Sequence, residues 1–324
     1  MIEVQNLTKV YGNHVAVDHV SFTIDSGKIY GFLGPNGAGK STTMNIITGC
    51  LAATEGTVTV DGHDIFEEPI AAKKCIGYLP EVPPLYPDMT VLDYLRFVAE
   101  AKGVTGKDMA AEVARVMEKT GVTDMRLRLI KNLSKGYRQR VGLAQAILGD
   151  PKVIILDEPT VGLDPQQLIE IRDLIRELGR DRTVMLSSHI MQEISAVCDM
   201  LIIIAGGKLV AEDTPEALAA RAEHGQTLRL TVKASANAAE NTLAALGDAL
   251  ETRVTREYDG LCELELTANG DADVREQLFY LFAEAKQPIL SMAREQQSLE
   301  DVFLTLTGGE AHAQAASVKG GGAR

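Results

Sequence analysis

Residues 34–42 read Gly-Pro-Asn-Gly-Ala-Gly-Lys-Ser-Thr, and they directly follow the apolar stretch Ile29–Leu33. The spacing Gly-x4-Gly-Lys-Ser is typical of a phosphate-binding loop between a strand and a helix. Glycines let backbone amides curl around an anion, and the helix that follows points its unpaired N–H groups at the phosphates. Lys40 is then expected to reach the β- and γ-phosphates, and the Ser41 hydroxyl to ligand Mg²⁺. The alternative is an ordinary glycine turn before a helix.

Length, composition and charge limit the class of protein. The 324 residues are 45% hydrophobic and 24% charged, which suits a globular chain long enough for two domains. The net charge of −13 argues against a nucleic-acid-binding surface, so we expect no nucleic-acid partner. No signal peptide is apparent, and the longest apolar run, near Met200–Ala205, falls far short of the ~20 residues of a membrane helix. Four scattered cysteines predict reduced thiols in a cytosolic protein: Cys50, Cys75, Cys198 and Cys262.

The first two thirds of the chain mix strand and helix patterns. Alternating apolar residues predict strands over the first 30 residues. Four prolines between residues 78 and 87 predict an extended loop, and the helices that follow form a helical subdomain at about 82–150. Two buried-type strands, 153–156 and 183–186, are separated by a helix. That order and spacing indicate a parallel sheet.

The last third has a different composition, beginning near residues 223–226. Its predicted order is strand, helix, two strands, helix and strand, which indicates a small α+β ferredoxin-like domain at 226–307. A short helix at 299–306 is expected to pack back on it. The Ala- and Gly-rich tail, 308–324, is expected to be disordered. We expect a stabilising or dimerising role for this domain, with a ligand sensor as the alternative.

A second chemical motif ends the strand at 153–156. Asp157 follows that strand at the edge where open α/β sheets bind ligands, so it is expected to hold Mg²⁺, mostly through water. Glu158 is positioned to orient the attacking water and accept its proton. The alternative is a strand that ends in two solvated acids.

Other polar residues have weaker signals on their own. Ser134 is expected to cap a helix, and such a helix start forms an anion site, although a simple cap explains it equally well. A lone histidine such as His189, after the next strand, is more often structural than catalytic. Together with the motifs above, these residues follow one order: phosphate loop, proline loop, Ser134-x-Gly136, Asp157-Glu158, Leu163-Asp164 and His189.

This order resembles the ATP-binding cassette (ABC) ATPase family over about residues 1–215. The resemblance implies an α/β P-loop NTPase cassette at 1–222, with a mixed sheet core, an antiparallel β subdomain and a helical subdomain. It also implies that ATP is bound by the whole phosphate loop: Gly34, Pro35, Asn36, Gly37, Ala38, Gly39, Lys40, Ser41 and Thr42.

The resemblance further assigns roles outside the loop. Tyr11 is implied to stack on adenine, although an aromatic residue at a strand edge is a fair alternative. Ser134 and Gly136 are implied to contact the γ-phosphate bound to the opposite subunit. Asp164 is implied to order the seam of that dimer, and His189 to touch the γ-phosphate.

Two positions depart from the family pattern. The usual signature Leu-Ser-Gly-Gly-Gln is replaced by a sequence with Lys135 and Tyr137, while Ser134 is kept. At the loop where the family has Gln, this chain has Glu81, whose carboxylate could still ligand Mg²⁺, with a solvated acid as the alternative. Both departures, and the run at 298–303, resemble bacterial exporter-type ABC ATPases of drug-export and gliding-motility systems.

We therefore expect an ATPase subunit, with ATP and Mg²⁺ as cofactors, that powers an ABC exporter. Its partners would be a second copy of itself and a separate membrane permease, which would hold it at the inner face of the plasma membrane. Val82, Leu85 and Tyr86 are expected to help form the groove for a permease helix. The alternatives are a soluble ABC ATPase without a permease and a nucleotide-binding regulator without turnover.

Overall fold

The computed structural model describes residues 1–324 except 189, 222–225, 269–272, 296–298, 300–301 and 309–324. By its internal contacts the chain divides into two compact units. The first comprises residues 1–215 with the described residues from Thr305 onward, and the second is Glu216–Leu304. The predicted domain limits, 1–222 and 226–307, stay a prediction. The predicted disordered tail, 308–324, lies outside the described residues except for Gly308.

The first unit opens with an antiparallel sheet, in the order β2-β1-β4-β5. Its residues alternate between buried and exposed, and Ile2 and Val4 face the core, as expected for a sheet with one covered face. The predicted antiparallel β subdomain is therefore confirmed. Its strands are β1 (Ile2–Tyr11), β2 (His14–Ile24), β4 (Glu55–Val60) and β5 (His63–Asp64).

A second, six-stranded sheet forms the centre of the unit, in the order β10-β9-β3-β8-β7-β6. Only the β9–β10 pair is antiparallel, so the predicted mixed sheet is confirmed. Every residue of β3, β7 and β8 is buried, as expected for parallel strands covered on both faces. The strands are β3 (Ile29–Leu33), β6 (Ile76–Leu79), β7 (Val153–Asp157), β8 (Thr183–Ser187), β9 (Met200–Ala205) and β10 (Lys208–Asp213).

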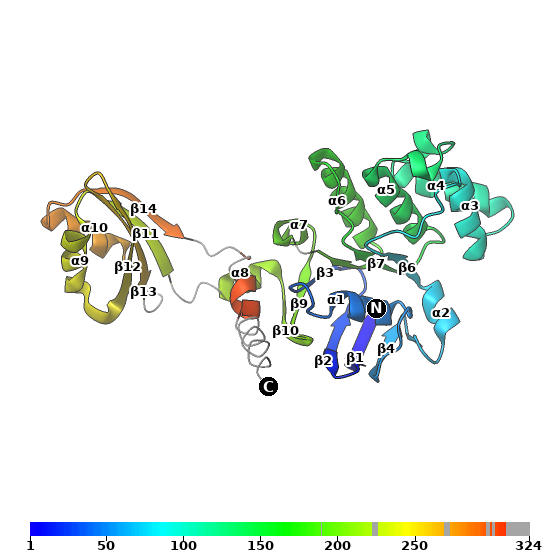
Figure 1. Ribbon diagram of the computed structural model, residues 1–324, viewed down its shortest axis with the longest axis horizontal. Helices are drawn as coiled ribbons and strands as arrows, with labels where there is room; N and C mark the ends of the chain where they lie inside the picture. Colours follow the sequence, from blue (N-terminus) through cyan, green and yellow to red (C-terminus); the bar gives the residue numbers. More distant parts are fainter. Residues whose placement is uncertain (189, 222–225, 269–272, 296–298, 300–301, 309–324) are drawn as a thin grey trace, which may run out of the picture. The chain divides into compact units, whose positions relative to one another are not determined.

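Helices surround this sheet, and α3, α4 and α5 gather beside its β6 edge (Figure 1). Thr90 caps α3, because its hydroxyl accepts a hydrogen bond from the backbone N–H of Asp93. One apolar cluster joins α1 to both sheets through Met44, Ile46 and Ile155. The helices of this unit are α1 (Lys40–Ile47), α2 (Pro69–Lys74), α3 (Val91–Ala101), α4 (Lys107–Lys119), α5 (Lys135–Ile147), α6 (Pro165–Gly179) and α7 (Met191–Ser195). The next helix, α8 (Pro215–Arg221), belongs to the second unit from Glu216 onward.

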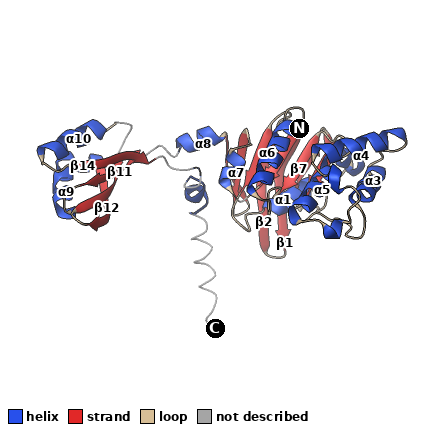
Figure 2. Ribbon diagram, turned by 90° about the horizontal axis from the view of Figure 1, so that it is seen from above, coloured by secondary structure: helices blue, strands red, loops and turns tan. Residues whose placement is uncertain are grey.

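The second unit has one antiparallel sheet, in the order β12-β13-β11-β14, with two helices on one face (Figure 2). This topology confirms the predicted ferredoxin-like fold. The first helix of this unit ends at Leu243 and continues as a 3₁₀ segment, Ala244–Ala249, which contains Gly247, a poor helix former. The elements are β11 (Gln226–Val232), α9 (Ala236–Leu243), β12 (Leu250–Tyr258), β13 (Leu261–Ala268), α10 (Arg275–Glu284) and β14 (Ile289–Glu295).

The predicted helix at 299–306 corresponds to helical residues 302–308. From Thr305 onward these residues group with the first unit, so they do not pack only on the second unit as expected. Sequence periodicity identifies an apolar helix face but does not specify which surface it meets. Among the described residues, no helix combines the length and apolar character needed to cross a membrane.

Candidate nucleotide-binding site

The loop between β3 and α1 is pressed against neighbouring backbone, which explains its glycines. A Cβ on Gly34 would lie 2.4 Å from the carbonyl oxygen of Ile204, and one on Gly39 would lie 2.5 Å from that of Ala16. Gly39 also has a φ of 101°, which side chains rarely adopt. It precedes α1 without a side-chain cap, so the first N–H groups of that helix are directed at the loop.

Lys40 folds back over this loop. Its ammonium donates hydrogen bonds to the carbonyl oxygens of Gly34 at 2.6 Å and Pro35 at 3.1 Å. Burial lowers the pKa of Lys40, while the nearby carboxylates of Glu158 and Asp157 raise it. The loop thus combines a partly desolvated cation with backbone amides, a pairing suited to phosphate.

The two acids at the end of β7, Asp157 and Glu158, are held by the neighbouring strand β8. Asp157 is opposite Ser187 in the parallel register, and the Ser187 hydroxyl donates to its carboxylate. The backbone N–H of Glu158 bonds the carbonyl and hydroxyl oxygens of Ser187, at 3.2 and 3.1 Å. Glu158 has a φ of 50°, a left-handed conformation that turns the chain sharply away from the strand.

The carboxyl of Asp157 is in an unusual electrostatic position. Burial raises its pKa, the hydrogen bond from Ser187 lowers it, Glu81 raises it and Lys40 lowers it. A buried carboxylate next to a second acid is stabilised in its charged form by a bound cation. Ser187 was not among the predicted site residues, although its place opposite Asp157 at a strand end was a usable signal.

These groups surround one cavity of about 530 Å³. Its size lies within the range of about 300–1,000 Å³ that is usual for small-molecule sites. Three lining residues, His14, Ala16 and Val161, were missed because isolated residues on a strand or loop carry no motif. The lining residues that the sequence did predict are Tyr11, Asn36, Gly37, Gly39, Lys40, Ser41, Thr42, Glu81, Asp157 and Glu158.

The remaining residues of the phosphate loop do not line the cavity, but two of them hold a group that does. Gly34 and Pro35 hold the Lys40 ammonium, and the buried Ala38 accepts a hydrogen bond from Gly207. Tyr11 is 47% exposed at the mouth of the cavity, and the Lys9 ammonium lies 5.2 Å from its ring centre. Its ring is therefore accessible for stacking.

The predicted signature residues, Ser134 and Gly136, and the predicted seam residue Asp164 lie at two helix starts and do not line the cavity. The Ser134 hydroxyl caps α5 by accepting from the N–H of Tyr137, and Asp164 caps α6 by accepting from the N–H of Gln167. A Cβ on Gly136 would lie 2.2 Å from the Gln167 side chain, so these two helix starts touch. His189, the other predicted contact to a phosphate, lies outside the described residues.

The donor set of the cavity fits a hard cation that also binds phosphate. Across the described part of the chain, no three His, Cys, Asp or Glu side chains form a metal site by themselves. Ser41, Glu81 and Asp157 nevertheless line the same cavity. Mg²⁺ typically takes one or two carboxylates and completes its shell with water and nucleotide phosphates, which agrees with this arrangement.

Comparisons with known proteins agree with this site. Residues 17–161 match the family model described as "ABC transporter". The chain is 34% identical to the linearmycin resistance ATP-binding protein LnrL of Bacillus subtilis, over 95% of this chain and 98% of that protein. It is also 34% identical to the bacitracin transport ATP-binding protein BcrA of Bacillus licheniformis, over 95% and 98%.

A solved structure extends the similarity to a nucleotide complex. It is a dimeric ATP-binding cassette in a post-hydrolysis state bound to ADP and Pi, with a TM-score of 0.61 and 25% identity. The match covers 66% of this chain and 98% of that one. From the fold, the site and this similarity, the chain belongs to the ABC transporter ATP-binding proteins, and it is an ATP-hydrolysing cassette of the exporter type.

Proposed function

We propose that two copies of this chain bind ATP and Mg²⁺ at two composite sites, and that hydrolysis drives a separate membrane permease. The observation that carries the proposal is the division of the predicted site. The cavity has the phosphate loop and the acids, whereas Ser134 and Gly136 lie at the start of α5, outside it. A head-to-tail dimer would bring the α5 start of one copy to the cavity of the other.

The residues of the cavity then divide the work of phosphoryl transfer. The Lys40 ammonium and the loop amides would neutralise the phosphate oxygens, and the N-terminus of the partner's α5 would face the γ-phosphate. Mg²⁺, held by Ser41 and Asp157 with Glu81 near it, would supply charge neutralisation at the phosphates. Glu158 would orient the attacking water and accept its proton, with His189 as a further contact to the γ-phosphate.

The permease would dock near the proline loop. Val82 is 80% exposed there, and Tyr86 packs against Tyr94 and Phe97 with ring centres 5.8 and 5.4 Å apart. A cavity of about 470 Å³ lies beside this loop and is lined in part by Pro84. Such a rigid apolar surface suits an amphipathic helix. It would place the chain at the inner face of the plasma membrane.

The cargo we propose is an antibiotic or a similar toxic compound. The support is the printed function of the full-length relatives, a linearmycin resistance protein and a bacitracin transport protein. Specificity would reside in the permease, because the cavity of this chain is built for phosphates. A soluble ABC ATPase without a permease is the second candidate, and the absence of a membrane-spanning helix among the described residues agrees with both candidates.

The first experiment uses the Glu158→Gln variant of the full chain. We expect it to bind ATP, to lose hydrolysis by about 10²-fold or more, and to form a stable dimer with ATP in light scattering. The wild-type chain should form that dimer only transiently. Full hydrolysis by Glu158→Gln would refute the role of Glu158, and a monomer at saturating ATP would refute the composite site.

A second experiment tests the permease. A crosslinkable cysteine at Tyr86 should label a membrane protein in cells, whereas one at the exposed Phe279 of the second unit should not. Equal labelling from the two positions, or none from Tyr86, would favour a soluble ATPase.

A further inference from the structure

The turn between α5 and β7 joins two functional parts of the cassette. The helix starts at the Ser134 cap, and the strand ends in Asp157, with only residues 148–152 between helix and strand. Two consecutive residues in this turn have a positive φ, Gly149 at 83° and Asp150 at 53°. The turn is therefore short and sharply bent, so a small rotation of α5 would be transmitted to β7.

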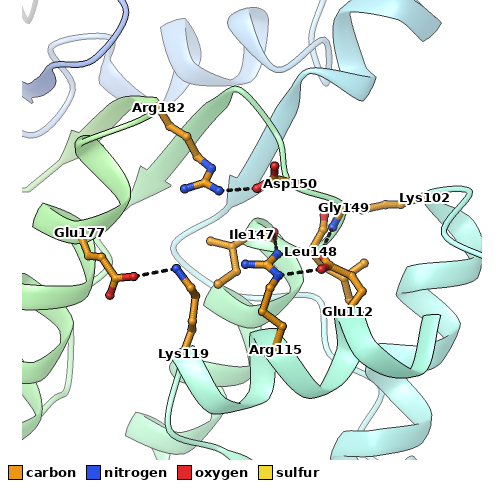
Figure 3. Close-up of polar contacts among 10 residues, drawn as sticks. All are labelled: Lys102, Glu112, Arg115, Lys119, Ile147, Leu148, Gly149, Asp150, Glu177 and Arg182. Atoms are coloured by element: carbon orange, nitrogen blue, oxygen red, sulfur yellow. Dashed lines mark hydrogen bonds and ion pairs between the residues drawn. The ribbon is translucent and has the colours of Figure 1, made fainter. Parts of the chain in front are cut away.

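The last carbonyl groups of α5 are capped by cations from two other helices (Figure 3). The Lys102 ammonium, just after α3, donates to the carbonyl oxygens of Gln145 at 2.9 Å, Ala146 at 3.2 Å and Leu148 at 2.8 Å. Arg115 of α4 donates to that of Ile147 at 3.4 Å. Cations are favoured at this negative end of a helix dipole, and these bonds satisfy carbonyls that the helix leaves open.

The turn itself is held from two further directions. The Glu112 carboxylate accepts from the N–H of Gly149 at 2.8 Å, and Arg115 holds it through two bonds of 2.7 Å. Asp150 is paired with Arg182, which precedes β8 (Figure 3). The bond from Arg115 lowers the pKa of Glu112, and that from Arg182 lowers the pKa of Asp150, so both acids are charged at neutral pH.

We propose that Lys102 is a positioning residue for ATP hydrolysis, clamping the end of α5 so that the signature start of this helix and the acids after β7 keep a fixed relation. The inference rests on the proposed function, in which Ser134 serves one ATP and Asp157 the other. A rigid turn would then couple the two sites of a dimer through each chain. Lys102 does not line the phosphate cavity, and its ammonium bonds the backbone at the end of α5, so it would act through that backbone.

The clamp depends on the charge of Lys102. An ammonium has three N–H donors, which match the three carbonyl acceptors here, whereas a neutral amine has two and must release one carbonyl. Although the residue as a whole is exposed, its ammonium is turned onto these carbonyls, and burial lowers the pKa of Lys102 to about 8, opposed by Glu112. The clamp therefore loosens as the pH rises through about 8.

Other charged residues lie on the elements around this ammonium. Glu112 and Arg115 approach from α4, and Asp150 lies in the turn. Lys73 and Lys74 of α2 line a cavity of about 660 Å³ that Lys102 also lines. Among these groups, the Glu112 carboxylate favours the charged form of Lys102.

The effect of Lys102 deprotonation on hydrolysis can be distinguished from unfolding, because the same deprotonation changes the free energy of unfolding in the opposite direction. The pKa of Lys102 is lowered from 10.5 in the unfolded chain to about 8, so the folded state binds fewer protons between these values. The contribution of Lys102 to the free energy of unfolding therefore rises with pH in that window. A loss of hydrolysis above pH 8 that arises from Lys102 must then occur without a loss of stability from the same group.

The test compares Lys102→Met and Lys102→Arg with Lys107→Met, an exposed lysine at the first position of α4. Measured on the full chain from pH 7 to 9.5, wild type and Lys107→Met should lose kcat above pH 8. Lys102→Met should have a kcat about tenfold lower at pH 7, with little further change up to pH 9.5. Lys102→Arg, which stays charged, should keep its kcat at high pH. KM for ATP should change by less than about twofold in all of them.

Several results would overturn the proposal. They are an unchanged kcat in Lys102→Met, a fall in Tm that parallels the fall in kcat, or an alkaline loss that persists in Lys102→Arg. If the wild-type chain shows no Mg²⁺-dependent hydrolysis, the proposed function fails, but the clamp does not fail with it. The clamp is then tested by measuring hydrogen exchange of the backbone amides. Lys102→Met should then speed exchange at the Gly149 amide relative to Lys107→Met, and equal rates would refute the clamp.

Discussion

Two regions of the cassette, the phosphate cavity and the signature surface, are built in different ways. The cavity gathers Lys40 from the start of α1 and Asp157 and Glu158 from the end of β7. Burial and, to a smaller extent, neighbouring groups shift the pKa values of Lys40 and Asp157. The signature surface, defined here as the two touching helix starts capped by Ser134 and Asp164, does not line that cavity. The cavity encloses charged side chains, whereas the signature surface presents backbone amides and a hydroxyl group to a partner outside the chain.

This difference teaches how far one chain can complete its chemistry. Enclosed, desolvated charges bind a phosphate chain and prepare water for attack, because electrostatic interactions are strong where water is excluded. An open helix start contributes little until another surface covers it. In the proposed dimer, the cavity of this chain would form half of one site, and the signature surface would form half of another. Each prediction below separates these two regions.

The largest effect is expected from mixing two inactive variants. Lys40→Met should inactivate the cavity, and Ser134→Arg should inactivate the signature surface, each lowering hydrolysis by about 10²-fold or more. In a head-to-tail dimer of one copy of each, one site contains both defects and the other contains neither. A one-to-one mixture should then recover up to about a quarter of the wild-type rate, because half of the dimers carry one intact site. Steady-state phosphate release measures this.

Two controls make the mixing experiment decisive. A mixture of Lys40→Met with Glu158→Gln, both in the cavity region, leaves a defect in each site and should not recover. Recovery in that control, or no recovery with Ser134→Arg although mixed dimers form, would contradict the assignment of the two regions to different sites.

A smaller effect is expected from the support of the cavity. Ser187 holds the Asp157 carboxylate and the Glu158 backbone from β8, so Ser187→Ala should leave both acids present but less well oriented. We expect hydrolysis to fall about tenfold and more Mg²⁺ to be needed for half-maximal rate, as for other residues that hold metal ligands. Ser291→Ala, at an exposed strand position of the second unit, is the matched control. An unchanged Mg²⁺ requirement would show that Ser187 acts only on folding.

The same two regions differ in what the sequence predicts. The cavity's motif residues were predicted because each follows a strand or begins a helix in a fixed spacing, and parallel strands bring such ends to one edge. Ser187 and Val161 were missed, because their roles depend on strand register and loop path. The cap at Ser134 is local and was predicted from the sequence, whereas the cap at Asp164 was not. That both lie outside the cavity is a property of the packed helices.

The fold was predictable to a similar degree. Strands made of apolar runs, such as β7 and β8, and the ferredoxin-like order of the second unit follow from local patterns. The strands β6 and β10 did not stand out, because β6 leads into the proline loop and β10 exists through its pairing with β9. The contacts of Lys102 could not be predicted from the sequence either, because a lysine just after a helix is usually solvated. Only the structure shows that three carbonyl oxygens surround its ammonium.

The smallest effect is expected at the mouth of the cavity, where Tyr11 is accessible and Lys9 lies over its ring. Stacking on a base is worth about 1 kcal/mol at an exposed position, so Tyr11→Ala should raise KM about fivefold and leave kcat nearly unchanged. Tyr11→Phe should keep most of the affinity. Because every base has a π-face, KM for GTP should rise with KM for ATP.

Tyr258 supplies a matched control, because its ring also lies under a cation, with Arg256 4.9 Å from its centre, but in the second unit. Tyr258→Ala should leave KM unchanged. If Tyr11→Ala also leaves KM unchanged, the base is held elsewhere, and Tyr11 is only an aromatic residue at a strand edge. If it instead lowers kcat, Tyr11 belongs to the surface that meets the second copy, and the boundary between the two regions has to be redrawn through the mouth of the cavity.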